Sequence, residues 1–339
     1  MVIGHSSCPN ILYKLIYSFH MPLFFILSGY FLNQDSLTNT RSFVINKVKK
    51  LAIPLICAAI ISLLLHNVLF QWGIITYGIH SKITHLFSIK ELFLRLVLIV
   101  CFLEVYDDPF LGPTWFIQSM FWSYLIIAFV HRTTHKESWT RLLIYGFSIM
   151  AGFCIVLTLI HMLFPTIKTV FITRIFMAGV FIYIGALTKK WLDKWQPCWW
   201  HFILLFGIVC TCLIVPFRIE MQEYIDVVQW LTLIITSCAG TFLIYGVIKL
   251  LVSNTKMHWN ILTYIGRNSI YVLFLHMLMF KPISYLILEI LHLDSNNSYN
   301  WIIYAAGSII LCLLFVFCKE QIKKLTNSYG TRIHHNAHI

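Results

Sequence analysis

The stretch SFHMPLFFILSGYF, residues 18–31, is apolar enough for a membrane helix but carries two unusual residues near its start. His20 is polar, and Pro22 lacks the backbone N–H that a helix interior uses. A membrane helix tolerates such a break where protein or a wet cavity covers it. We therefore expect a kinked helix that turns His20 into a cavity; the alternative is a role in packing alone. The small pair Ser28 and Gly29 permits close approach of another helix.

The rest of the chain is equally apolar. Of its 339 residues, 59% are hydrophobic and only 11% are charged, whereas an average soluble domain is about 25% charged. Nine stretches are long enough to cross a bilayer, and the sequence predicts an all-α integral membrane protein, a polytopic helix bundle. These stretches are 11–32, 51–71, 114–130, 141–164, 171–188, 201–217, 228–250, 264–291 and 300–318. A further stretch, 89–105, is interrupted by charges and is interpreted as interfacial or re-entrant.

The distribution of charge predicts an orientation. If the first span runs from outside to inside, 17 of the 25 lysines and arginines fall in the inside segments, but only four of the 13 acidic residues do. This is the positive-inside asymmetry of membrane proteins. It predicts a multi-pass protein of the inner (cytoplasmic) membrane with a cytoplasmic C-terminus, and it explains the basic composition through contact with membrane lipid. Nothing in the sequence indicates a nucleic-acid partner, and the ten cysteines contain no CxxC pair that would indicate a metal site.

Three further places carry polar residues that a membrane normally excludes. VIGHS, residues 2–6, places His5 after a short apolar stretch, where an imidazole could act as a general base on a hydroxyl or could simply be solvated. NKVKKLAIP, residues 46–54, sets Lys47 and Lys50 ahead of a proline. These cations could hold a phosphate-bearing molecule such as coenzyme A, although positive-inside anchoring explains them equally well. Trp115 stands near the start of an apolar run and is interpreted as an interface anchor. His276 stands at the end of another apolar run and is interpreted as an intramembrane histidine.

Together these segments resemble the acyltransferase 3 family, bacterial membrane enzymes that O-acylate cell-surface carbohydrates. The resemblance rests on VIGHS, FHMPLFFILSGYF, the basic loop that leads into LAIP, GPTWFIQSMFW and IGRNSIYVLFLH, in that order along residues 2 to about 280. The long phrase that contains His20 and Pro22 is the most specific of them.

The resemblance implies the roles of several residues. His5 would be the general base that takes a proton from an acceptor hydroxyl. Lys47 and Lys50 match paired basic positions, usually arginines, that would help hold acyl-CoA. His20, Ser28 and Gly29 match the motif of the second helix, and Trp115 and His276 match later signature positions. The expected partners are acyl-CoA, which is the donor substrate rather than a bound cofactor, a carbohydrate acceptor and membrane lipid.

The resemblance also implies ten helices, one more than the nine predicted spans. We therefore expect residues 1–318 to form a membrane acyltransferase domain with a truncated first helix, and residues 319–339 to form a polar cytoplasmic tail. The family carries a basic residue eleven positions before the first-helix histidine, and that position falls before Met1. The leading hypothesis is an O-acetyltransferase or an enzyme for a similar short acyl group. A transporter or glycan exporter, or an inactive truncated copy, are the alternatives.

Overall fold

The computed structural model describes residues 1–76, 79, 85–103, 110–134, 138–217, 219, 221, 226–254, 260–293 and 299–336. These residues form helices and connecting turns with no β-strand, which confirms the all-α class. The bounds of the helices are α1 Val2–His5, α2 Asn10–Tyr17, α3 His20–Tyr30, α4 Gln34–Thr38, α5 Thr40–Lys47, η1 Val48–Ala52, α6 Ile53–Gln71, α7 Ile89–Val100, η2 Gly112–Thr114, α8 Trp115–Thr133, α9 Trp139–Leu163, α10 Val170–Lys194, α11 Trp199–Cys210, η3 Thr211–Leu213, α12 Val227–Asn254, α13 Asn260–Arg267, α14 Ser269–Tyr285, η4 Leu286–Ile290 and α15 Asn300–Asn336.

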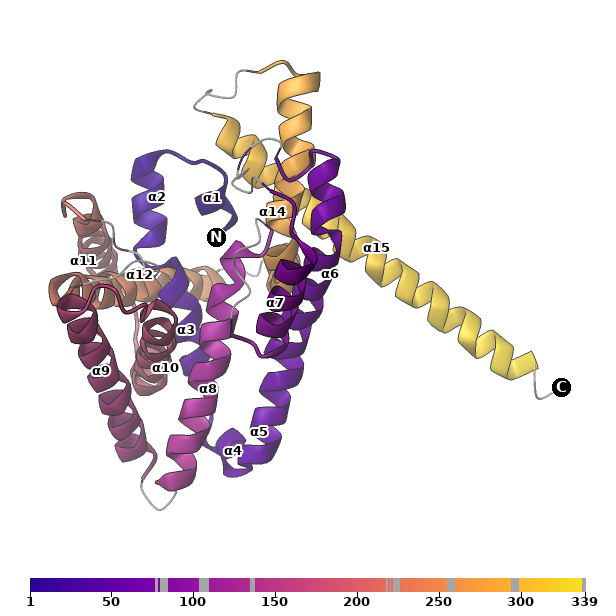
Figure 1. Cartoon of the computed structure of the whole chain (residues 1–339). Coiled ribbons are helices and arrows are strands. Elements are labelled where there is room, and N and C mark those ends of the chain that lie inside the picture. Colours follow the sequence, from indigo (N-terminus) through magenta and orange to yellow (C-terminus); the bar gives the residue numbers. More distant parts are fainter. Residues whose placement is uncertain are drawn as a thin grey trace.

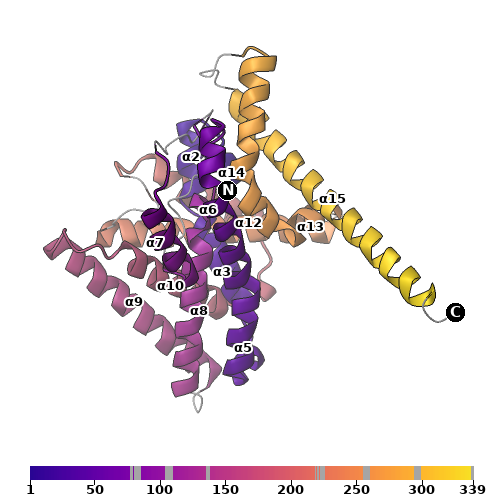
Figure 2. The same cartoon turned by 45° about the vertical axis from the view of Figure 1, so that its right-hand side comes forward.

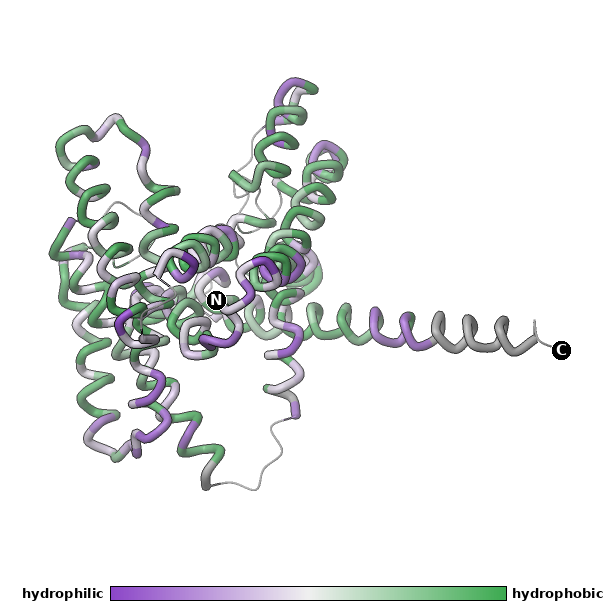
Figure 3. The backbone as a smooth tube through the Cα atoms, turned by 90° about the horizontal axis from the view of Figure 1, so that it is seen from below, coloured by the Kyte–Doolittle hydropathy of each residue, from purple (hydrophilic) through white to green (hydrophobic). Residues whose placement is uncertain are grey.

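Eight helical segments among the described residues are long and apolar enough to span a membrane. They correspond to eight of the nine predicted spans. The ninth prediction, 201–217, falls on the shorter apolar helix Trp199–Leu213, which is about 22 Å long at 1.5 Å per residue. Figure 3 shows apolar residues along most of the helices and hydrophilic residues mainly near their ends. The protein is therefore a polytopic membrane bundle.

The basic segment that contains α4 and α5 lies at the end of the molecule where α8 ends and α9 begins. In Figures 1 and 2, α4 and α5 lie at the same end of the molecule as the C-terminal end of α8 and the N-terminal end of α9. The charge pattern assigned both regions to the same side of the membrane. Helix α15 diverges from the bundle toward the C-terminus (Figure 1) and continues to Asn336, past the predicted domain end at residue 318.

The predicted interfacial stretch 89–105 begins with the amphipathic helix α7, which packs against α6. Its twelve residues measure about 18 Å, which is too short to cross the hydrocarbon core. Ser88 caps its N-terminus by accepting a hydrogen bond from the backbone N–H of Glu91. Phe93 is 67% exposed on its surface, which fits a helix that lies against lipid.

The predicted kink is present, but it precedes the proline. The chain bends at Ser18 and Phe19, between α2 and α3, and Pro22 occupies the first turn of α3. A proline is tolerated there because the first turn does not use its N–H groups. The carbonyl oxygen of Ser18, which would have paired with residue 22, accepts hydrogen bonds from the hydroxyls of Thr236 and Ser237 on α12 at 3.3 and 3.2 Å. Protein hydroxyls therefore satisfy the carbonyl that the proline leaves without an N–H donor.

Helices α3 and α10 cross with their backbones in contact. A Cβ atom added to Gly29 would lie 1.8 Å from the carbonyl oxygen of Ile182, and one added to Gly185 would lie 1.9 Å from that of Ile26. Gly29 of α3 thus faces the backbone of α10, and Gly185 of α10 faces the backbone of α3. Small residues have this role at close helix crossings in membranes. This crossing fixes α3, which carries His20 at its first residue and Ser28 near its last.

Candidate active site

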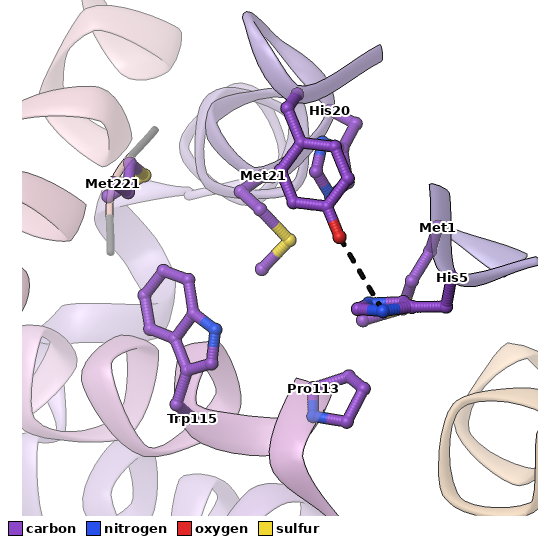
Figure 4. A pocket seen from close by; sticks show the side chains of 8 residues that line it. Met1, His5, His20, Met21, Pro113, Trp115 and Met221 are labelled. Atoms are coloured by element: carbon purple, nitrogen blue, oxygen red, sulfur yellow. Dashed lines mark hydrogen bonds between the residues drawn. The ribbon is translucent and has the colours of Figure 1, made fainter. Parts of the chain in front are cut away.

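A pocket lies where the N-terminal helices meet α8 and the turn that contains Met221. It is small and partly open to solvent, with room for about one water molecule, about 10 Å³. Figure 4 shows its polar side chains converging from separate elements. The lining residues are Met1, His5, Tyr17, His20, Met21, Pro113, Trp115 and Met221. Three of the predicted site residues, His5, His20 and Trp115, therefore share one pocket.

His5, the last residue of α1, lies among other aromatic and imidazole rings. Helix α1 packs against α2, α14 and α15, which brings His5 to His276 of α14 with ring centres 5.6 Å apart. The Nδ1 atom of His5 lies 3.5 Å from the hydroxyl oxygen of Tyr17, at the long end of hydrogen bonding. The Tyr17 ring meets His20 edge-on with ring centres 4.6 Å apart. His276 and Tyr17 thus contact the predicted base, and His20 lies behind Tyr17 in the same pocket.

The tautomers of two histidines follow from their partners. His20 Nδ1 lies 2.9 Å from the carbonyl oxygen of Ile16, and His276 Nδ1 lies 3.0 and 2.8 Å from those of Val272 and Leu273. Because a carbonyl only accepts, each Nδ1 must carry a hydrogen, and the basic nitrogen of the neutral ring is then Nε2. Within the described part of the chain, no three His, Cys, Asp or Glu side chains are grouped as metal ligands would be.

Trp115 forms one wall of the pocket and rests on a buried cation. It begins α8, is 3% exposed, and carries the guanidinium of Arg174 from α10 at 4.7 Å from its ring centre. Such a contact is an attractive cation–π interaction. Sequence reasoning missed Arg174, although a charge inside the predicted span 171–188 was a signal that could have found it.

The predicted donor residue Lys47 belongs to a second group of side chains at the other end of α3. We call Lys47, Phe43, Tyr124 and Ser28 the lysine cluster. Lys47 is half-buried, with Nζ 3.4 Å from the ring centre of Tyr124, and the Tyr124 hydroxyl forms a hydrogen bond with the Ser28 hydroxyl. Lys50 is exposed in η1, a π-helical turn of a kind that is frequent at functional sites.

The predicted site residues therefore occupy three settings. His5, His20 and Trp115 line the pocket, and His276 contacts it through His5. Ser28 and Lys47 belong to the lysine cluster, with Lys50 nearby in sequence and exposed. Pro22 and Gly29 shape α3 and its crossing with α10. Sequence reasoning missed Tyr17, Tyr124 and Arg174.

Cys8 lies in the turn between α1 and α2, close in sequence to the pocket. Its thiol is half-buried, and this burial raises its pKa. A raised pKa keeps the thiol protonated near neutral pH, and the thiol is a much weaker nucleophile than the thiolate. The imidazoles are therefore the better candidates for chemistry at this end of the molecule.

The fold and the pocket define a multi-pass membrane protein with a histidine site, and comparison with known proteins gives the family. The acyltransferase 3 family model, described as an acyltransferase domain, matches residues 1–317. The chain belongs to this family and is a membrane acyltransferase. Searches of curated proteins and of solved structures found no match.

Proposed function

We propose that the protein transfers an acetyl or similar short acyl group from acyl-CoA to a hydroxyl of a cell-surface or secreted carbohydrate, with His5 as the general base. The observation that carries the proposal is the convergence of His5 with His20 and Trp115 in one pocket, beside His276. These residues come from segments far apart in the chain. An imidazole can accept a proton near neutral pH, which is what activation of a hydroxyl requires.

The reaction is an ordinary acyl transfer. His5 takes the proton of the acceptor hydroxyl while the hydroxyl oxygen attacks the carbonyl carbon of the thioester. The carbon–sulfur bond then breaks, and the imidazolium returns the proton to the leaving thiolate. The products are an O-acyl ester and free coenzyme A, so His5 ends the cycle neutral. General base catalysis of this kind contributes about 10²–10⁴-fold to the rate.

The lysine cluster supports the assignment of the donor. His20 and Ser28 are eight residues apart on α3, which corresponds to about 12 Å along the helix axis. Lys47 stands beyond Ser28, on the ring of Tyr124. A cation there can pair with a phosphate of coenzyme A while the thioester end of the same molecule reaches toward the pocket. Lys50 is the second cation in this proposal. In the orientation that we propose, this end and the C-terminus face the cytoplasm of an inner-membrane protein.

The test is His5→Ala in purified protein supplied with acetyl-CoA and the surface polysaccharide of the host cell. Free thiol release and ester formation on the polysaccharide are both measured. We expect both rates to fall by about 10²–10⁴-fold with the amount of inserted protein unchanged. His85→Ala is the matched control, because His85 is an exposed histidine that contacts Glu91, outside the pocket. Unchanged ester formation in His5→Ala would overturn the assignment of the base.

The same preparation separates an enzyme from a transporter or exporter. In sealed vesicles, a transporter moves its solute in response to a proton or sodium gradient. The proposed acyltransferase instead forms ester in detergent, where no gradient exists. Ester formation by the detergent-solubilised wild-type protein therefore supports the enzyme, and gradient-driven polysaccharide flux without ester formation would contradict it.

A further inference from the structure

We propose that Tyr17 is a positioning residue that fixes the tautomer and orientation of His5, so that Nε2 is the basic nitrogen that meets the acceptor hydroxyl. The inference rests on the proposed function, because it assumes that His5 acts as the base. Its starting point is the 3.5 Å contact between the Tyr17 hydroxyl oxygen and Nδ1 of His5 (Figure 4).

Tyr17 is held firmly by its surroundings. Its side chain is only 9% exposed. One ring face stacks on Tyr13 with ring centres 4.0 Å apart, and the ring meets His20 in an edge contact at 4.6 Å. A Cβ added to Gly4 would lie 2.8 Å from Cε2 of Tyr17, so the ring packs against the backbone immediately before His5. The hydroxyl is therefore presented to His5 from a fixed direction.

The direction of the hydrogen bond follows from the chemistry required of His5. A neutral imidazole has one nitrogen that donates and one that accepts. If the Tyr17 hydroxyl donated to Nδ1, the ring hydrogen would be on Nε2, and that nitrogen could not take a proton. If Nδ1–H donates to the Tyr17 oxygen instead, Nε2 is basic. When Nε2 then takes the proton of the acceptor, the same contact becomes a charge-assisted hydrogen bond, which is the stronger kind.

The neighbouring histidines have the same arrangement. His20 and His276 each donate from Nδ1 to backbone carbonyls of their own or the preceding helix. For His5 the carbonyl four residues earlier is that of Met1, which accepts a hydrogen bond from the backbone N–H of His5 at 3.2 Å. Tyr17, which reaches His5 from α2, provides the oxygen that a carbonyl provides for the other two. All three rings then share the Nδ1–H tautomer.

The test compares Tyr17→Phe with Tyr13→Phe. Tyr17→Phe removes the hydroxyl and keeps the ring, and Tyr13→Phe makes the same change at the stacked neighbour, which does not line the pocket. The first readout is solid-state ¹⁵N NMR of histidine-labelled protein in lipid bilayers, with the His5 signals assigned by their loss in His5→Ala. The second readout is kcat/KM for ester formation from acetyl-CoA.

We expect a protonated Nδ1 and an unprotonated Nε2 on neutral His5 in the wild-type protein and in Tyr13→Phe. In Tyr17→Phe we expect a mixture of both tautomers and a kcat/KM lower by about 10- to 100-fold, the range for loss of a hydrogen bond to a charged group. A His5 spectrum identical in Tyr17→Phe and wild type would overturn the inference, as would an Nε2–H tautomer in the wild type.

The NMR readout separates this failure from failure of the proposed function. If His5 proves dispensable for ester formation but its tautomer still depends on Tyr17, the positioning contact stands and the catalytic assignment of His5 falls. If His5 is essential and Tyr17→Phe changes neither spectrum nor rate, the proposed function stands and the role of Tyr17 falls. Gly4→Ala adds a second perturbation, because its Cβ would displace the Tyr17 ring without removing the hydroxyl.

Discussion

At its N-terminal end, α3 places His20 in a pocket whose lining comes from α1, α2, α3, η2, α8 and the turn at Met221. At its C-terminal end, it places Ser28 in the lysine cluster, which is built from α3, α5 and α8 alone. Many segments must be correctly packed to form the pocket, whereas the lysine cluster needs only three neighbouring helices. The comparison indicates that the geometry of the pocket depends on the packing of several distant segments, whereas the geometry of the lysine cluster depends on a local contact among three helices.

Substitution of Gly29 by Leu breaks both regions at once and should have the largest effect. Because even a Cβ would lie 1.8 Å from the carbonyl oxygen of Ile182, α3 cannot keep its contact with α10. We expect a loss of about 3 kcal/mol or more in stability, above the usual range for overpacking because the obstacle is backbone. Thermal unfolding in detergent measures it. Gly207→Ala is the control, since its Cβ would meet no atom within 4 Å; equal stability of the two variants would contradict the close crossing.

Lys47→Ala should separate the two regions. We expect the KM for acetyl-CoA to rise by roughly tenfold, because a charge-assisted hydrogen bond to phosphate is lost, while the His5 tautomer stays as in the wild type. Arg41→Ala, at an exposed cation of the same helix α5, should leave KM unchanged. Steady-state kinetics with acetyl-CoA as the varied substrate provides the check. A fall in kcat without a change in KM would move Lys47 out of the proposed donor site.

A double-mutant cycle on Ser28 and Tyr124 should give the smallest effect on KM, and it tests a single hydrogen bond of the lysine cluster. Ser28→Ala and Tyr124→Phe each remove one partner of the hydroxyl pair, so each should raise KM for acetyl-CoA by a few-fold, equivalent to about 1 kcal/mol. The double variant should be little worse than either single one, because both remove the same bond. Fully additive effects would show that the two hydroxyls act independently of each other.

Much of the fold could be predicted from the sequence, because membrane helices must satisfy their backbone hydrogen bonds internally and are therefore long and apolar. The bend between α2 and α3 was predicted from Pro22, and it lies at Ser18, the residue whose carbonyl loses its N–H donor to the proline. The hydroxyls on α12 that satisfy this carbonyl could not be predicted, because a local pattern does not contain that distant partner.

The site was predictable only in part, for a related reason. Histidines and paired lysines stand out in an apolar chain, so His5, His20, His276 and Lys47 could be selected one by one. Tyr17 and Tyr124 could not, because they are two of the 16 tyrosines in the chain and only their neighbours in the folded protein distinguish them. Arg174 carried a recognisable signal, a charge within an apolar stretch, yet its contact with Trp115 depends on how α8 and α10 pack.

The contacts that complete the pocket also impose an order on biosynthesis. The hydroxyls that pair with the Ser18 carbonyl lie 218 and 219 residues further along the chain, and His276 lies further still. At about 5–20 residues per second of synthesis, His5 must wait on the order of half a minute before the helix that carries its neighbour leaves the ribosome. His5 is thus made well before α14 and reaches its final environment only after α14 has joined the bundle.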